Sequence, residues 1–268
     1  MKSAWALPGA LAIVVQAAPA AAQPPMRLAF DYAGSLNALH VTGEVKVLSL
    51  HVVETARPDD FATNAQMHSF GLLRALRPID ITTTAAGPVA AGLPQPQAFA
   101  FTTLDKKQLR RVTLVWRQDR VVVTPPHHDD GDPPLTPAAE LSASDPVTLF
   151  SRAVYAKSGP ELCARNWRFF DGAVVYELQF QPGGPVPLGP ADQALGLVAA
   201  LRCQVRYTEV AGFRHKPGER RDEGLQSDIH VEFGQLGAGG PWIFVSMKAD
   251  TILGYAKVQL TGVQVERP

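Results

Sequence analysis

The chain has 268 residues, with 25 basic and 25 acidic side chains and a formal net charge of zero. This balance excludes a nucleic-acid-binding protein that relies on bulk attraction to phosphate, and it excludes an acidic solvating chain. With 22 glycines and 23 prolines, the composition favours many turns, and therefore short strands more than long helices.

The first 22 residues are predicted to be a signal peptide. Lys2 supplies a positive start, Trp5–Val15 is apolar, and Ala20-Ala21-Ala22 fits a cleavage site before Gln23. A buried N-terminal helix is the alternative, but no helix-ending signal follows the apolar stretch. This stretch is too short to span a bilayer and no longer apolar run follows, so we expect a periplasmic protein without a transmembrane segment.

Alternation of apolar and polar residues predicts about eleven strands in the rest of the chain. The expected strands are Arg27–Ala33, His40–Val53, Ile79–Thr84, Gln97–Thr103, Arg111–Trp116, Val121–Val123, Val174–Phe180, Cys203–Thr208, Ile229–Phe233, Trp242–Lys248 and Tyr255–Val265. Connections without long helical crossovers favour antiparallel pairing, and a sheet of this size usually curls. We therefore expect residues 23–268 to form one mainly β domain, with a strongly curved, barrel-like antiparallel sheet and one or two short helices.

A dense group of metal-type ligands lies within the loop predicted at Pro125–Pro137. It reads His127-His128-Asp129-Asp130-Gly131-Asp132. Imidazoles and carboxylates can bind divalent ions, so a metal-dependent or other hydrolase that uses residues 127–132 is one functional hypothesis. However, prolines flank the group, and adjacent histidines point apart on extended chain. An exposed loop without a bound metal is the favoured interpretation, and no cofactor is expected.

Two short helices are predicted. The first has Ser144 or Asp145 as its N-cap and Pro146 as its first residue. Its apolar face would consist of Leu149, Phe150, Ala153 and Val154. The second would cover Ala191–Leu201.

Glycine and proline mark two connections in the second half of the chain. Asp171-Gly172 predicts a tight hairpin, because both central residues of a type I′ turn need a positive φ. The composition of Gln181–Pro190 predicts a loop.

Cys163 and Cys203 are the only cysteines. In an exported protein, such a pair most simply forms a structural disulfide. A redox-active pair is the sharper alternative, but that chemistry favours a C-x-x-C spacing, which this chain lacks. Free thiols are the third alternative.

Nucleophilic catalysis has no sequence signature here, and no catalytic residue is predicted. The G-x-S-x-G motif of serine hydrolases is absent from the sequence. His68 and Ser69 are neighbours in the chain, but a catalytic triad is assembled across the fold, so their adjacency carries no weight.

Four segments of the chain share a recognisable order and spacing: Asp145-Pro146-Val147-Thr148; Cys163 followed by Phe170-Asp171-Gly172 and Tyr176-Glu177-Leu178; Cys203–Tyr207 followed by Ala211-Gly212-Phe213; and Pro241 with Thr251 and Gly254. These segments resemble an exported bacterial family, domain of unknown function 3108. The resemblance implies a secreted or periplasmic β-rich protein with two linked cysteines, and it implies no known activity. One departure is that Ala173-Val174-Val175 follow the glycine where the family pattern has basic residues.

The favoured function is a non-enzymatic periplasmic protein that binds an apolar ligand, such as a lipid or another envelope component. A curved sheet has a concave face, and Phe, Tyr, Trp and Val side chains on it could hold such a ligand. The alternative is that these side chains only fill the core. The hydrolase hypothesis is the rival from another class, and the sequence leaves the ligand and the oligomeric state open.

Overall fold

The computed structural model describes residues 25–38, 44–76, 78–105, 108–126, 131–214, 229–251 and 254–266. These residues form fourteen strands and five short helices. The strands are β1 (Met26–Ala38), β2 (Val45–Ala56), β3 (Asp60–Ser69), β4 (Asp80–Ala90), β5 (Leu93–Pro94), β6 (Ala98–Asp105), β7 (Gln108–Trp116), β8 (Val121–Thr124), β9 (Asn166–Phe170), β10 (Val175–Pro185), β11 (Leu197–Ala211), β12 (Ile229–Leu236), β13 (Trp242–Thr251) and β14 (Gly254–Glu266). The helices are α1 (Gly71–Leu76), α2 (Pro137–Leu141), α3 (Thr148–Val154), α4 (Gly159–Cys163) and α5 (Pro190–Ala194).

One antiparallel sheet contains all of these strands. Its order is β8-β7-β6-β4-β3-β2-β1-β14-β13-β12-β11-β10-β9, and β5 pairs with β4 outside this path. Neighbours in the sheet are mostly neighbours in the chain, whereas β1 and β14 join the two halves. The predicted fold class is confirmed, although the described residues contain more strands than the sequence predicts.

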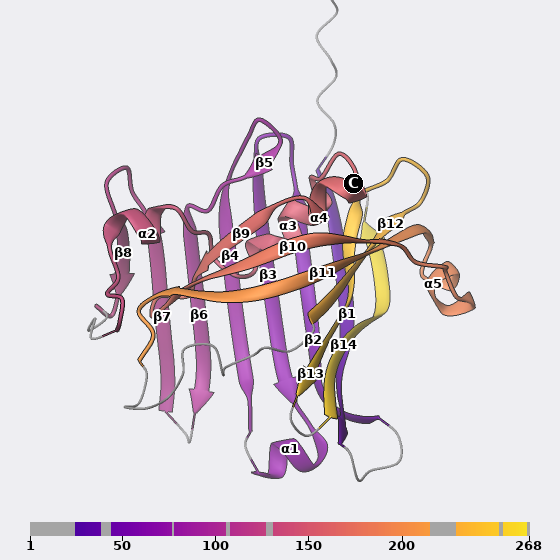
Figure 1. The fold of residues 1–268 in the computed structure, drawn as a ribbon, viewed down its shortest axis with the longest axis horizontal. Coiled ribbons are helices and arrows are strands. Elements are labelled where there is room, and N and C mark those ends of the chain that lie inside the picture. The colour runs from indigo at the N-terminus through magenta and orange to yellow at the C-terminus, as the bar shows by residue number, and fades with distance from the viewer. Residues whose placement is uncertain are drawn as a thin grey trace, which may run out of the picture.

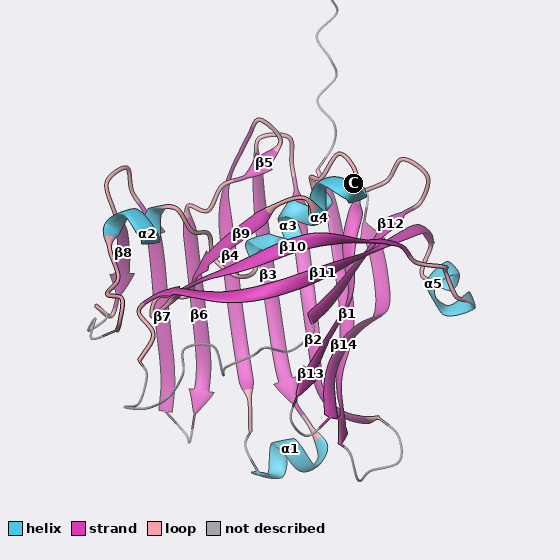
Figure 2. Ribbon diagram, viewed as in Figure 1, coloured by secondary structure: helices cyan, strands magenta, loops and turns pink. Residues whose placement is uncertain are grey.

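The sheet curls over itself without closing. Figure 1 shows β9, β10 and β11 running across the face of β3, β4, β6 and β7, with α3 and α4 near one end of the curl. In the described part of the chain, β8 and β9 end the strand order and do not pair with each other. This shape follows from twist that accumulates over many strands. Figure 2 shows how little helix accompanies the sheet.

The inward side chains form two packed groups. One group lies where β1 and β2 meet the C-terminal strands and helices α3 and α4, and it includes Phe30, Phe233 and Phe244. The other lies under β3 to β8, where Phe61 and other residues of these strands pack against the β9–β10 hairpin. The helices therefore cover one side of the concave face, and the hairpin covers part of the other.

Strand β3 is the main element that the sequence does not predict. Its inward residues include Phe61, Thr63 and Ala65, which are buried although only one of them is large and apolar. Apolar alternation is weak in such a strand, and pairing with β2 and β4 determines its structure instead.

The predicted helix over Ala191–Leu201 is mostly wrong, because α5 ends at Ala194 and β11 begins at Leu197. Gly196, with a φ of 83°, separates the two elements. The loop predicted at Gln181–Pro190 is also partly wrong, since β10 continues to Pro185. The last residues of β10 extend beyond β9 and pair only with β11 among the described strands. This end of β10 is therefore an edge of the sheet, where prolines are tolerated because their missing N–H group is not needed for pairing.

The first predicted helix is present as α3, and it begins slightly later than expected. Asp145 Oδ1 accepts the N–H groups of Val147 and Thr148, at 3.0 and 2.9 Å. Asp145 therefore makes the hydrogen bonds of the predicted N-cap residue, and regular helical bonding begins at Thr148.

Candidate functional site

Along β6 and β7, the side chains on the concave face change from apolar to polar. Cross-strand neighbours on this face are Phe99 with Leu114, Phe101 with Val112, and Thr103 with Arg110. The first pair is buried, the second is half-buried, and Arg110 is exposed. One end of these strands therefore offers an apolar, water-excluded surface, and the other end offers a polar one.

A cavity of about 400 Å³ adjoins the apolar part of this face. Strands β2, β3, β4 and β6 form one wall, and the segment leading into α3 and the β9–β10 hairpin form the other. The lining residues are Leu50, Ala65, Met67, Ile81, Thr83, Phe99, Phe101, Pro146, Val147, Phe150, Asp171 and Tyr176. Asp171 is the one charged residue among these described side chains, so the cavity suits an apolar group.

A second cavity of about 680 Å³ lies toward the polar end of β6 and β7. Its lining consists of Phe101, Thr103, Arg110, Val112, Val123, Pro125, Pro126, Asp171, Gly172, Ala173, Val174, Gly212, Phe213 and Arg214. Phe101 and Asp171 line both cavities, so the two spaces adjoin at these residues. Together they offer an apolar compartment next to one that contains basic side chains.

The β9–β10 hairpin holds Asp171 at this junction. Asp171 Oδ1 accepts the N–H groups of Ala173 and Val174, at 2.9 and 3.0 Å. Residues 171–174 connect the paired Phe170 and Val175, so the predicted two-residue type I′ turn is wrong. Of these four residues only Gly172 has a positive φ, 98°.

Gly172 also permits close packing between the hairpin and the sheet. A Cβ atom at this position would lie 2.8 Å from Cγ1 of Val112, closer than side-chain atoms normally approach. The hairpin therefore lies directly on the inner face of β7.

A buried polar group lies between α3 and the sheet, outside the lining of either cavity. Thr63 Oγ1 donates to Glu54 Oε2 at 2.5 Å and lies 2.8 Å from Ser151 Oγ. Glu54 is fully buried, and its Oε1 has no hydrogen-bond partner in the described part of the chain. Burial raises the pKa of Glu54 to about 8, so this side chain is largely protonated at neutral pH.

A second buried carboxyl group, Asp145, lies near the first. Burial raises the pKa of Asp145 to about 6, although its hydrogen bonds with Thr148 oppose the shift. Burial also lowers the pKa of Arg152 to about 10, and its guanidinium lies 4.4 Å from the centroid of the Trp167 ring. These groups hold α3 in place, and neither carboxyl group nor Arg152 lines the two cavities described above.

Two residues of interest were not singled out from the sequence. Alternation puts Arg110 on the same face as Val112, but the strand expected there begins at Arg111. Likewise Glu54 continues the inward face of β2, one residue beyond the strand expected to end at Val53. In both cases, a charged residue at an inward position of an alternating strand could have indicated a residue of interest.

Cys163 and Cys203 are joined by a disulfide, with Cα atoms 5.3 Å apart. Cys163 is the last residue of α4, Cys203 lies in β11, and both are fully buried. The bond therefore ties the helical segment to β11, and neither cysteine lines either cavity.

The His/Asp-rich group falls largely outside the described residues. This applies to His127, His128, Asp129 and Asp130. Of the remaining two residues, Asp132 donates its backbone N–H to the carbonyl of Phe213 at 2.9 Å. Among the residues that the structure describes, no group of three or more His, Cys, Asp or Glu side chains could hold a metal ion.

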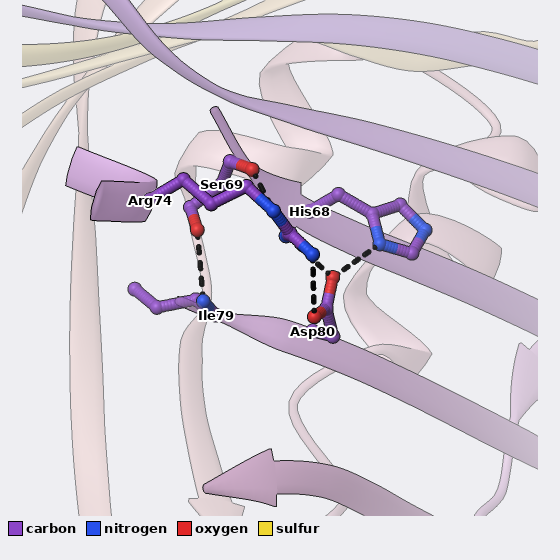
Figure 3. Close-up of polar contacts among 5 residues, drawn as sticks. All are labelled: His68, Ser69, Arg74, Ile79 and Asp80. Carbon is purple, nitrogen blue, oxygen red and sulfur yellow. Dashed lines mark hydrogen bonds and ion pairs between the residues drawn. The ribbon is translucent and has the colours of Figure 1, made fainter. Parts of the chain in front are cut away.

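His68 and Ser69 do not form a catalytic pair. His68 Nδ1 lies 2.8 Å from Asp80 Oδ1, whereas Ser69 Oγ accepts the backbone N–H of Ile79, also at 2.8 Å (Figure 3). Arg74 donates two hydrogen bonds to Asp80 and one to the Ser69 carbonyl. Hydrogen bonds from Arg74 and His68 lower the pKa of Asp80 to about 2, and this network ties β3 and α1 to β4.

In the described ranges, no helix is long and apolar enough to cross a membrane. No family model and no curated protein matches the chain. The chain is similar in structure to a beta-barrel-like protein of Domain of Unknown Function DUF1849 from Brucella abortus. The TM-score is 0.52 at 15% sequence identity, over 92% of this chain and 100% of that one. This likeness concerns the fold alone, and the resemblance to domain of unknown function 3108 remains an expectation.

Proposed function

We propose that the protein binds an apolar ligand in the cavity between the concave face of β2–β6 and the segments that cross it. The observation that carries this proposal is the cavity of about 400 Å³ with an almost wholly apolar lining. Its volume falls within the range of about 300–1,000 Å³ that is typical of small-molecule sites. A lipid or another apolar envelope component is the ligand class we favour, and we propose no catalytic step.

The rival interpretation is that the inward side chains only fill a core. Two features favour binding. The large side chains Met67, Ile81 and Phe101 are only partly buried, although they face inward. The space that they line has a volume of about 400 Å³, whereas side chains that only fill a core pack closely and leave few spaces larger than a water molecule.

A matched pair of substitutions on β4 tests the proposal. Ile81 lines the cavity, and the adjacent Thr82 is exposed on the opposite face of the same strand. We expect Ile81→Trp to weaken binding of the apolar dye N-phenyl-1-naphthylamine by about fivefold or more, because the indole occupies the cavity. Fluorescence titration measures the effect, and circular dichroism establishes that the variant is folded.

Thr82→Trp is the control, and dye affinity should match that of the parent protein. Equal dye affinity for the folded Ile81→Trp variant and the parent would contradict binding in this cavity. Absence of dye binding to the parent protein would also contradict it.

We also propose that the protein is exported to the periplasm after cleavage before Gln23. The support is the order of Lys2, an apolar stretch and Ala20-Ala21-Ala22, all of which lie outside the described residues. N-terminal sequencing of protein from a periplasmic extract should read from Gln23. A protein that retains Met1 and stays in the cytoplasm would refute both the cleavage and the location.

A further inference from the structure

We infer that the ligand is a single-chain amphiphile with an anionic head, of the alkyl carboxylate class, and that the head binds at Arg110. This inference rests on the proposed function and adds the chemistry of the polar end of the ligand. The alkyl chain would occupy the smaller cavity, and the head would lie in the adjoining larger one.

Arg110 is placed for this role by the pairing of β6 and β7. Its cross-strand neighbour is Thr103, and the next inward pair toward the smaller cavity is Phe101 with Val112. All four line the larger cavity. A ligand that follows the inner face therefore passes from apolar contacts to a guanidinium, which is the order of groups in an amphiphile.

Arg110 carries a charge that the described residues leave without a partner. Its guanidinium has no ion pair or hydrogen bond with any side chain in the ranges that the structure describes. Guanidinium groups bind carboxylates through two parallel hydrogen bonds, so an anionic head complements this position.

The size of the apolar compartment favours one alkyl chain over two. At about 400 Å³ it is near the lower end of the range for small-molecule sites. Phe101 lines both cavities, so a chain that leaves the smaller one continues along the Phe101 ring into the space beside Arg110.

Asp171 sets the direction in which the head must point. Its carboxylate lies at the junction and is the one charge among the described residues that line the smaller cavity, so an anion there would be repelled. The larger cavity contains Arg110 and Arg214 as well as Asp171. Of these two cavities, the smaller one is lined by no described basic side chain, whereas Arg110 lines the larger one, so an anionic head is better placed there.

Displacement of bound N-phenyl-1-naphthylamine tests the inference in the chain from Gln23 to Pro268, at about pH 7, where an alkyl carboxylate is ionised. Competitors with the same chain length are dodecanoate, dodecanol and dodecyltrimethylammonium. We expect dodecanoate to displace the dye at about fivefold lower concentration than dodecyltrimethylammonium. Salt at about 0.5 M should reduce this preference, because exposed charges are screened.

Variants assign the preference to one side chain. Arg110→Gln should weaken the binding of dodecanoate about fivefold and leave the binding of dodecanol unchanged. Arg111→Gln is the matched control, because this neighbour points to the opposite face of β7, and it should behave like the parent. Asp171→Asn keeps an oxygen that can accept the N–H groups of the turn, and it should strengthen dodecanoate binding.

The outcomes separate this inference from the proposed function. If dodecanol displaces the dye but dodecanoate is no better than the ammonium, the anionic head is refuted and the apolar site stands. An equal loss for Arg110→Gln and Arg111→Gln, or an equal effect of Arg110→Gln on dodecanoate and dodecanol, also refutes the role of Arg110. If neither the dye nor any amphiphile binds, both proposals fail.

Discussion

Replacement of Glu54 by glutamine is expected to remove most of the dependence of folding stability on pH between about 4.5 and 8. The pKa of Glu54 rises from an ordinary 4.5 to about 8 on folding, because the side chain is buried. The folded protein therefore favours the protonated acid. The stability that the folded protein gains from the higher pKa of Glu54 is fully present below about pH 4.5, and it is lost as the pH rises through about 8.

Glu54 alone is expected to account for a loss on the order of 4 kcal/mol of unfolding free energy in the parent protein over this range. Glutamine matches the protonated acid in shape, and its oxygen can accept the hydroxyl of Thr63. Glu54→Gln should therefore be nearly constant in stability above about pH 6. A smaller slope should remain below that pH, because the pKa of Asp145 is also raised, to about 6.

Urea unfolding at several pH values measures the effect. Glu266→Gln serves as the control, because Glu266 is an exposed carboxylate on β14, and its profile should follow that of the parent. If the parent and Glu54→Gln lose the same stability between about pH 5 and 8, the protonated buried acid is not the cause.

Removal of the Cys163–Cys203 disulfide is expected to lower the free energy of unfolding by about 2–5 kcal/mol. The bond closes a loop with a sequence separation of 40 and links α4 to β11. Such a loss is a large part of the roughly 5–15 kcal/mol that stabilises a typical domain. Cys163→Ala with Cys203→Ala is the preferred variant, because serine would add two buried hydroxyl groups.

Urea denaturation compares the double variant with the oxidised parent and with the parent after reduction. Reduction alone should give a loss of similar size, which separates the effect of the bond from that of the new side chains. Free thiols in the native exported protein, or a double variant as stable as the parent, would argue against a structural disulfide.

The sequence predicts those parts of the fold that depend on strong alternation. The strands around Leu114, Phe180 and Phe233 have large inward residues at every second position, and each is a strand in the structure. Strand β3 has threonine and alanine at inward positions, and only its neighbours β2 and β4 reveal that it pairs.

The candidate site is less accessible to sequence analysis than the fold. The expectation of a concave apolar surface is based on residue types, whereas the cavity depends on where the β9–β10 hairpin lies. This position is fixed by the contact of Gly172 with Val112, residues that are 60 positions apart in the chain. Local patterns contain no information about a contact of this range.

The pairing of β1 with β14 has a consequence for the order of folding. Arg27 lies opposite Glu266 in this ladder, and their side chains form an ion pair of 2.9 Å. Within β1 to β8, and within β9 to β14, the paired strands are mostly consecutive in the chain, but the seam between the two sets joins residues near the two ends of the described chain. Bringing together residues this far apart in the chain costs more conformational entropy than forming any of the hairpins. We therefore expect the β1–β14 pairing to form last and most slowly.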